Sequence, residues 1–284
     1  MKRTSICSFV SERGLTILFR KALAIAACVL MLAFVFAGCS KKTDDSADNS
    51  LANITTKGQL NMGVDDAFPP MGFRSESNEI VGFDIDMARE VCSRMGVELN
   101  LVPIDWTAKE NILDSGRIDC IWNGYTMTDK RKERVLFTKP YLDNAQVIMV
   151  LTGSDIAAKS DLAGKIVGLQ EDSSAEDAVA ADDINTALAE LKKYPENNSC
   201  LLDLQAKRID AMVVDEVVAR YYMAKATGTY VLLADDLGTE EYGIGFRKTE
   251  AALRDKVQET LDAMKADGKS AEISTVWFGE DMVK

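Results

Sequence analysis

The chain has 284 residues, of which 47% are hydrophobic and 27% charged, so it has enough apolar surface for one large core or two medium ones. Only five prolines and 18 glycines occur, which excludes collagen-like and low-complexity classes. The formal net charge of -12 argues against a nucleic-acid-binding surface. No histidine is present, which excludes Ser-His-Asp and Cys-His catalysis and histidine-bearing zinc sites.

The N-terminus has the pattern of a secretory signal. Basic residues precede an apolar stretch at 22–37, which is followed by Gly38 and Cys39. This stretch is about 16 residues long and therefore shorter than the ~20 that a membrane-spanning helix needs. It resembles a bacterial lipoprotein signal, with residues 1–38 removed and Cys39 lipidated, although Phe36 replaces the more usual leucine. The alternative is an uncleaved anchor helix. Both alternatives place the rest of the chain outside the cytoplasm, attached to the cell membrane.

The polar segment that follows, at 39–53, has the composition of a flexible tether. The cysteines beyond it are odd in number and show no motif spacing, so we expect small buried hydrophobes rather than a disulfide framework. These are Cys92, Cys120 and Cys200. Three acidic doublets lack the spacing of a calcium loop, and we expect solvated surface there. The doublets are Asp182-Asp183, Asp235-Asp236 and Glu240-Glu241.

Strands and helices alternate along the rest of the chain, which predicts an α/β fold with mostly parallel sheets. In the first half we predict strands at 59–65, 99–103 and 118–122 and helices at 84–95, 106–113 and 128–135, the last capped by Thr128. In the second half we predict strands at 166–169, 211–214 and 242–246 and helices from 174, at 199–206, at 216–225 and at 251–266. Residues 113–119 and 204–210 echo one another, which fits two similar lobes.

Several motifs together resemble the bacterial extracellular solute-binding proteins of family 3, the amino-acid receptors of ABC importers. The motifs lie at 63–65, 82–88 (GFDIDMA), 117–119, 123–131 (NGYTMTDKR), 137–141, 162–168 and 215–216. The resemblance extends over most of the chain beyond the signal.

The resemblance implies a two-lobed periplasmic-binding-protein-like fold of type II. In it, each lobe is a mixed, mostly parallel sheet flanked by helices, and two strands join the lobes. Lobe 1 would comprise residues 54–143 and 242–284, and lobe 2 residues 144–241, with the crossings near Asn144 and Tyr242.

Arg131 is the candidate for the carboxylate of an amino acid, because a guanidinium matches a carboxylate with two parallel hydrogen bonds. From the charged run around it alone, a solvated helix face is the simpler interpretation. The resemblance favours the carboxylate. It also implies main-chain and hydroxyl contacts to the carboxylate from Asn123, Gly124 and Thr126.

Asp215 is the candidate for the ammonium group, since it ends an apolar strand at the edge where open α/β sheets bind ligands. It could also cap the helix that follows. Ser174 begins a helix and could add to anion binding. Asp172 stands where the family usually has glycine, which leaves the choice between Ser173 and Ser174 open.

The ligand's side chain would meet three further residues that the resemblance implies. Asp65 matches the position that contacts a polar or basic side chain, and Phe68 and Trp106 match aromatic walls. Plain core packing is the alternative for Phe68. Trp122 and Tyr125 could also line the pocket. Arginine, lysine, histidine or glutamine would suit Asp65.

The expected function is therefore capture of a free L-amino acid by closure of the two lobes, for delivery to an ABC permease and ATPase. We expect a monomer with no cofactor, no metal and no nucleic-acid partner. A dehydratase of the same fold and an extracellular amino-acid sensor are the alternatives.

Overall fold

The computed structural model describes residues 48–284. The predicted signal peptide, Cys39 and most of the predicted tether lie outside the described residues. Helix α2 (Ser50–Lys57) begins inside the segment assigned to the tether, so the prediction that the tether extends to residue 53 is wrong. Within residues 48–284, no helix is both long and apolar enough to cross a membrane.

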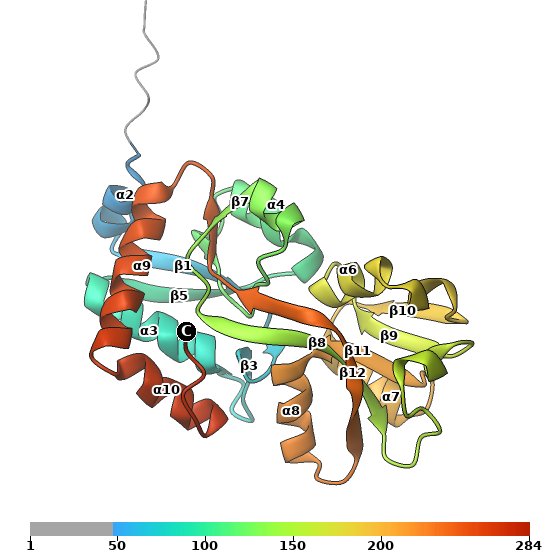
Figure 1. Ribbon diagram of the computed structural model, residues 1–284. Helices are drawn as coiled ribbons and strands as arrows, with labels where there is room; N and C mark the ends of the chain where they lie inside the picture. Colours follow the sequence, from blue (N-terminus) through green and yellow to red (C-terminus); the bar gives the residue numbers. More distant parts are fainter. Residues whose placement is uncertain (1–47) are drawn as a thin grey trace, which may run out of the picture. The chain divides into compact units, whose positions relative to one another are not determined.

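The first lobe is built on a five-stranded sheet with the order β5-β1-β6-β13-β7 (Figure 1). Strand β1 is parallel to β5 and β6, whereas β13 is antiparallel to β6 and β7. The strands are β1 (Gln59–Val64), β5 (Glu98–Pro103), β6 (Cys120–Ile121), β7 (Val135–Phe137) and β13 (Gly245–Arg247). A small sheet adds β2 (Ala67–Phe68), β3 (Gly72–Arg74) and β4 (Ile80–Val81). The accompanying helices are α2, α3 (Phe83–Met95), η1 (Trp106–Ala108), α4 (Lys109–Asp114), α5 (Asp129–Arg134), α9 (Ala251–Ala266) and α10 (Lys269–Phe278).

The second lobe has its own five-stranded sheet, with the order β10-β9-β11-β8-β12. Strand β9 is parallel to β10 and β11, and β8 is antiparallel to β11 and β12. The strands are β8 (Leu142–Leu151), β9 (Ile166–Gln170), β10 (Glu190–Tyr194), β11 (Ala211–Asp215) and β12 (Tyr230–Tyr242). The accompanying helices are η2 (Lys159–Leu162), α6 (Ser174–Ala181), η3 (Asp183–Thr186), α7 (Asn197–Gln205) and α8 (Glu216–Lys225).

Strands β8 and β12 are long and join the two lobes. They pair antiparallel from Leu142 with Tyr242 at one end to Leu151 with Tyr230 at the other, with two irregularities between. In Figure 1 they run side by side from the first sheet into the second. The predicted fold class, two α/β lobes joined by two strands, is confirmed.

Most predicted elements form where local sequence signals are strong. Helix α3 buries Ile85, Ala88 and Val91 on one face and ends at Gly96, whose φ of 70° is the left-handed conformation that glycine favours. Helices α8 and α9 have the predicted bounds. The predicted cap of α5 is also confirmed, because the Thr128 side chain accepts a hydrogen bond from the amide of Arg131.

Other elements differ from the prediction. The strand predicted at 118–122 is only Cys120–Ile121, and the one predicted at 242–246 is divided between the end of β12 and β13. The sequence analysis missed α2, β7, β10, the small sheet and α10. Strand β10 contains two lysines and lies at the edge of its sheet, where solvent accommodates charged side chains that obscure the apolar alternation.

The largest hydrophobic cluster extends through both lobes. It includes Leu60 and Phe83 from lobe 1 and Leu204, Met212 and Val218 from lobe 2. Two smaller clusters lie one in each lobe. The cysteines at 92, 120 and 200 are buried and unpaired within residues 48–284, as expected.

Candidate functional site

Polar side chains from both lobes meet where the strands of the two sheets end. Asp65 follows β1 and Asn123 lies just after β6, both in lobe 1. In lobe 2, residues 171–174 follow β9, and Asp215 is the last residue of β11. Hydrogen bonds join these ends across the lobes, so they form one site.

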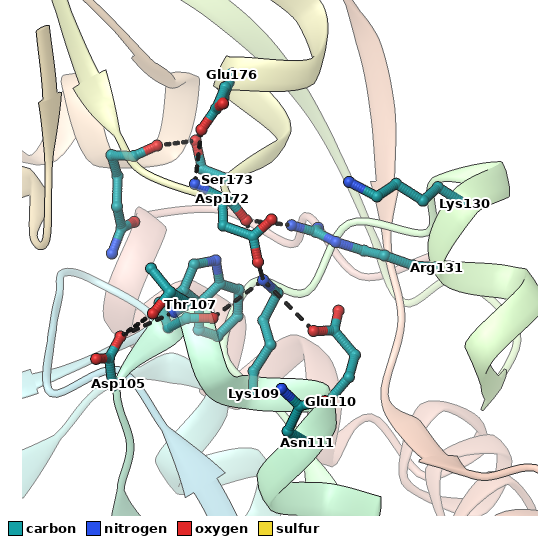
Figure 2. Close-up of polar contacts among 12 residues, drawn as sticks. Asp105, Thr107, Lys109, Glu110, Asn111, Lys130, Arg131, Asp172, Ser173 and Glu176 are labelled. Atoms are coloured by element: carbon teal, nitrogen blue, oxygen red, sulfur yellow. Dashed lines mark hydrogen bonds and ion pairs between the residues drawn. The ribbon is translucent and has the colours of Figure 1, made fainter.

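Arg131 lies on α5 and is buried, with only 5% of its surface exposed, so it is not part of a solvated helix face. Its guanidinium lies 4.8 Å from the centre of the Tyr125 ring. It donates to the main-chain oxygen of Thr126 at 3.2 Å. It also donates to the main-chain oxygen of Asp172, in lobe 2, at 3.2 Å (Figure 2). A guanidinium has five N–H groups, so donors remain for a carboxylate.

Three hydroxyl and carboxylate groups gather between the lobes beside Arg131. The hydroxyls of Thr126 and Ser174 are 3.0 Å apart, although one belongs to each lobe. A carboxylate oxygen of Glu240, on β12, accepts from Thr126 at 2.9 Å and lies 3.4 Å from Ser174. The same oxygen accepts from the side-chain amide of Gln146 at 2.9 Å.

Asp215 is buried and does not cap α8 through its side chain, so the helix-cap alternative is wrong. Its carboxylate accepts from Asn144 at 2.7 Å and from the Tyr242 hydroxyl at 2.6 Å. Asn144 also donates to Glu240, so one amide bridges the two acids. Burial, and then the negative charge of Glu240, raise the pKa of Asp215 well above its usual value. A bound cation would relieve both effects.

Asp65 accepts hydrogen bonds from both lobes. The amide of Ala67 donates to it at 3.0 Å, and the side chain of Gln170, in lobe 2, donates at 2.8 Å. Burial raises the pKa of Asp65 to about 6, whereas the bond from Gln170 opposes this increase.

The predicted aromatic residues are all buried. Trp106 packs edge-on to Tyr125 with ring centres 5.8 Å apart, in a cluster of lobe 1. Phe68 belongs to the large cluster that extends through both lobes. Trp122 lies in that same core and packs against Tyr141. Phe68 and Trp122 therefore both have packing partners in the core.

Gly124 has a φ of 55°, and a Cβ there would lie 2.7 Å from the Phe68 ring. Its amide donates to Asp84 at 2.8 Å, so this main-chain donor is occupied by a buried carboxylate. The backbone at Gly124 thus lies close to the Phe68 ring, which leaves no room for a side chain at this position. Asn123 is 1% exposed, and its side-chain atoms have no hydrogen-bond partner within residues 48–284.

The two candidate serines have different environments. Ser173 caps α6, because its hydroxyl accepts from the amide of Glu176, and it donates to the main chain of Gln170 at 2.6 Å. Ser174 instead reaches Thr126 in lobe 1 and accepts from Gln146 at 3.2 Å. Of the two hydroxyls, that of Ser174 faces the opposite lobe.

The sequence analysis missed the central role of Glu240. The Glu240-Glu241 doublet was expected to be solvated surface, and this expectation is wrong for Glu240, which is partly buried and accepts hydrogen bonds from Thr126, Asn144 and Gln146. It lies directly opposite Asn144 in the pairing of β12 with β8. Only this pairing, across 96 positions of sequence, brings the two together.

A cavity of about 820 Å³ opens beside the cluster of Thr126, Ser174 and Glu240. All the charged residues that line this cavity are acidic. The acidic residues are Asp129, Asp143, Asp177, Glu240 and Glu241. In the described part of the chain, no group of three or more acidic or cysteine side chains is placed to bind a metal ion.

Two α/β lobes joined by two strands, with buried groups of opposite charge at their junction, are an arrangement suited to enclosing a small charged solute. Residues 60–280 match the bacterial extracellular solute-binding proteins, family 3, and the chain belongs to this family. Members of this family act outside the cytoplasm. The role of this protein is solute binding rather than catalysis.

Similar proteins support this assignment. The L-cystine-binding protein TcyJ of Escherichia coli (strain K12) is 30% identical over 90% of this chain and 95% of its own. A crystal structure of an ABC uptake transporter substrate-binding protein from Streptococcus pneumoniae with bound histidine is 37% identical, with a TM-score of 0.81, over 84% of this chain and 99% of its own. The structure of Tv2483 bound to L-arginine is 31% identical, with a TM-score of 0.79, over 83% of this chain and 97% of its own.

Proposed function

We propose that this protein captures a free L-amino acid with a polar or basic side chain and delivers it to an ABC permease and ATPase. The observation that carries the proposal is that buried Arg131 and buried Asp215 belong to opposite lobes and connect through Thr126, Glu240 and Asn144. One similar protein is named for cystine and two others were solved with histidine and L-arginine bound, which supports this ligand class.

The carboxylate of the ligand would bind Arg131, with the Thr126 and Ser174 hydroxyls beside it. Arg131 is already oriented within lobe 1, because its guanidinium lies over the Tyr125 ring and donates to the main-chain oxygen of Thr126. This preorganisation lowers the entropy lost on binding. The Glu240 carboxylate now accepts from Thr126, so a ligand carboxylate would replace it there.

The ammonium group would bind Asp215, because a positive charge offsets the burial of this carboxylate and its repulsion from Glu240. Asp65 would accept hydrogen bonds from the ligand's side chain, in place of the bond from Gln170. Trp106 and Phe68 would pack against its aliphatic part. A buried acid at this position suits arginine, lysine, histidine or glutamine.

Binding would favour closure, because Arg131 and Asp65 belong to lobe 1 whereas Ser174 and Asp215 belong to lobe 2. We place the lobe boundaries at the two crossings, after residues 143 and 241, where β8 and β12 leave the first lobe. The permease would recognise the closed form of a monomeric protein. Cys39, if lipidated, would attach the protein to the membrane through the residues before Ser50.

Thermal-shift measurements against the common L-amino acids and L-cystine test the function. A ligand that binds only the native state raises the Tm. We expect a clear increase with a polar or basic amino acid. Arg131→Ala should weaken this binding by about 100-fold or more, because removing one partner of a buried ionic contact costs about 3 to 5 kcal/mol.

Arg134→Ala is the matched control, since Arg134 lies on the same helix but is exposed and pairs with Asp114. It should bind like the wild type. No Tm increase with any amino acid in the panel, or unchanged binding by Arg131→Ala, would contradict the proposal.

A further inference from the structure

Lys109 is a buried lysine at the start of α4, and its side chain is 1% exposed. The ammonium group donates three hydrogen bonds, to the main-chain oxygen of Trp106 at 3.0 Å, to that of Asp172 at 3.0 Å and to the Asp172 carboxylate at 2.6 Å (Figure 2). An ammonium has three N–H donors, so all are used. Two of the three bonds cross from lobe 1 to lobe 2.

Burial of Lys109 is unfavourable unless its charge is paired. Desolvation, and then the like charge of Arg131, lower the pKa of Lys109, while Glu110 and Asp172 oppose this. The Glu110 carboxylate is 3.7 Å away, whereas that of Asp172 is in direct contact. The closest compensating charge therefore comes from the other lobe and is present only when the lobes are together.

Asp172 also fixes the segment that faces Arg131. Its φ of 54° is left-handed, and its amide donates to Glu176 at 2.8 Å. Its main-chain oxygen accepts from both Lys109 and Arg131. Figure 2 shows the two cations approaching Asp172 from lobe 1. Lys109 and Arg131 thus share one acceptor, so the position of one constrains the position of the other.

We propose that Lys109 is a positioning residue: paired with Asp172 across the lobes, it stabilises the closed arrangement, orients Arg131 and slows ligand release without contacting the ligand. The effect on ligand release rests on the function proposed above. The effect on closure does not, because the pair contains only residues of this chain.

Asp172 and Lys109 differ in how much it costs to leave each of them unpaired. The Asp172 side chain is 41% exposed, so water can solvate it when Lys109 is removed. Lys109 is inaccessible to water, so loss of the Asp172 charge leaves Lys109 near the like charge of Arg131 in the closed state, with only the more distant Glu110, at 3.7 Å, as a counter-charge. Asp172→Asn should therefore favour the open state more than Lys109→Met does.

The experiment compares Lys109→Met, Asp172→Asn and the double variant in the purified protein. Nitroxide labels on Ser93→Cys in lobe 1 and Leu202→Cys in lobe 2 report the closed fraction without ligand. Stopped-flow tryptophan fluorescence reports the dissociation rate of the amino acid that raises the Tm. We expect each single variant to lower the closed fraction and to raise the dissociation rate at least tenfold, with a smaller change in the association rate. The double variant should not add the two effects, because both remove the same contact.

Lys159→Met is the control, since its 2.7 Å ion pair with Asp182 lies entirely within lobe 2. It should change neither quantity. Additive effects in the double variant, or a lower Tm in Lys109→Met with unchanged closure and dissociation, would overturn the proposal and leave a purely structural ion pair. If no amino acid binds the wild type, the proposed function fails, and the closed fraction without ligand still tests the Lys109–Asp172 pair.

Discussion

Buried carboxylates dominate the chemistry of this protein at the scale of single residues. Asp84, from the motif that begins at Gly82, is fully buried and accepts from the amide of Gly124 and the hydroxyl of Tyr141. Burial raises its pKa to about 7. Its role is to fix the segment after β6, whereas the acids that face the other lobe are Asp65, Asp215 and Glu240.

Asp65 gives a pH prediction with a definite sign. Its pKa is about 6 in the folded protein and 3.8 in the unfolded chain, so between these values the folded state binds more protons. The free energy of unfolding should therefore increase as the pH falls from about 6 to about 4, by about 3 kcal/mol at most from this group. Asp65→Asn removes this contribution.

The measurement is the Tm of the wild type and of Asp65→Asn at pH 7.5 and pH 4.5. The Tm of the variant, relative to that of the wild type, should be lower at pH 4.5 than at pH 7.5. Because other acids titrate equally in both proteins, the difference isolates Asp65. A difference that stays constant across this range would contradict the raised pKa.

At the scale of elements, the short helix α5 determines where Arg131 lies. It has only six residues, which are too few for a helix that is stable alone. The hydroxyl of its N-cap residue, Thr128, accepts a hydrogen bond from the amide of Arg131 at 3.2 Å. The same residue therefore stabilises the helix and anchors the backbone of the proposed carboxylate-binding residue.

Thr128→Ala should lower the free energy of unfolding by about 1 kcal/mol, because an N-cap hydrogen bond is lost. It should also weaken amino-acid binding by several-fold. Thr128→Ser retains the oxygen and should restore both. Thr275→Ala, which removes an exposed hydroxyl that bonds within α10, is the control. Chemical denaturation measures the free energy of unfolding, and titration calorimetry measures the binding. If Thr128→Ala matched the wild type in both quantities, the prediction would be contradicted.

The two joining strands bring the rest of the site together. Asn144 and Gln146 are two positions apart on β8 and therefore point to the same face. Both donate to Glu240 on the neighbouring strand β12. The joining strands are consequently part of the polar site and not only a connection between the lobes.

At the scale of the whole molecule, one hydrophobic cluster extends through both lobes. We therefore expect the described part of the chain to unfold as one cooperative unit, despite its two sheets. The tryptophans at 106, 122 and 277 all belong to lobe 1, so their fluorescence reports mainly on the unfolding of that lobe.

Leu204→Ala in the core of lobe 2 should therefore lower the unfolding midpoint that lobe 1 reports. Leu204 is 1% exposed, and such a truncation costs about 2 to 5 kcal/mol. Tryptophan fluorescence and circular dichroism should shift together in denaturant. The exposed Leu202→Ala, on the same helix, should change little. A fluorescence midpoint unaffected by Leu204→Ala would show that the lobes unfold independently.

The sequence by itself determined the local elements and the family. Apolar periodicity, caps and glycine stops defined α3, α5, α8 and α9, because these signals act within one or two turns. The motifs also identified Arg131 and Asp215, which the structure shows to be buried on opposite lobes.

Only the tertiary structure decided which groups surround these residues. Glu240, Gln170 and Lys109 have no motif of their own, and each acquires its partners from the other lobe or from a neighbouring strand. The local sequence could not reveal such contacts, because a charged residue has the same local pattern on a solvated surface as in a buried pair. What distinguishes the two is desolvation, and desolvation depends on which distant segments pack together.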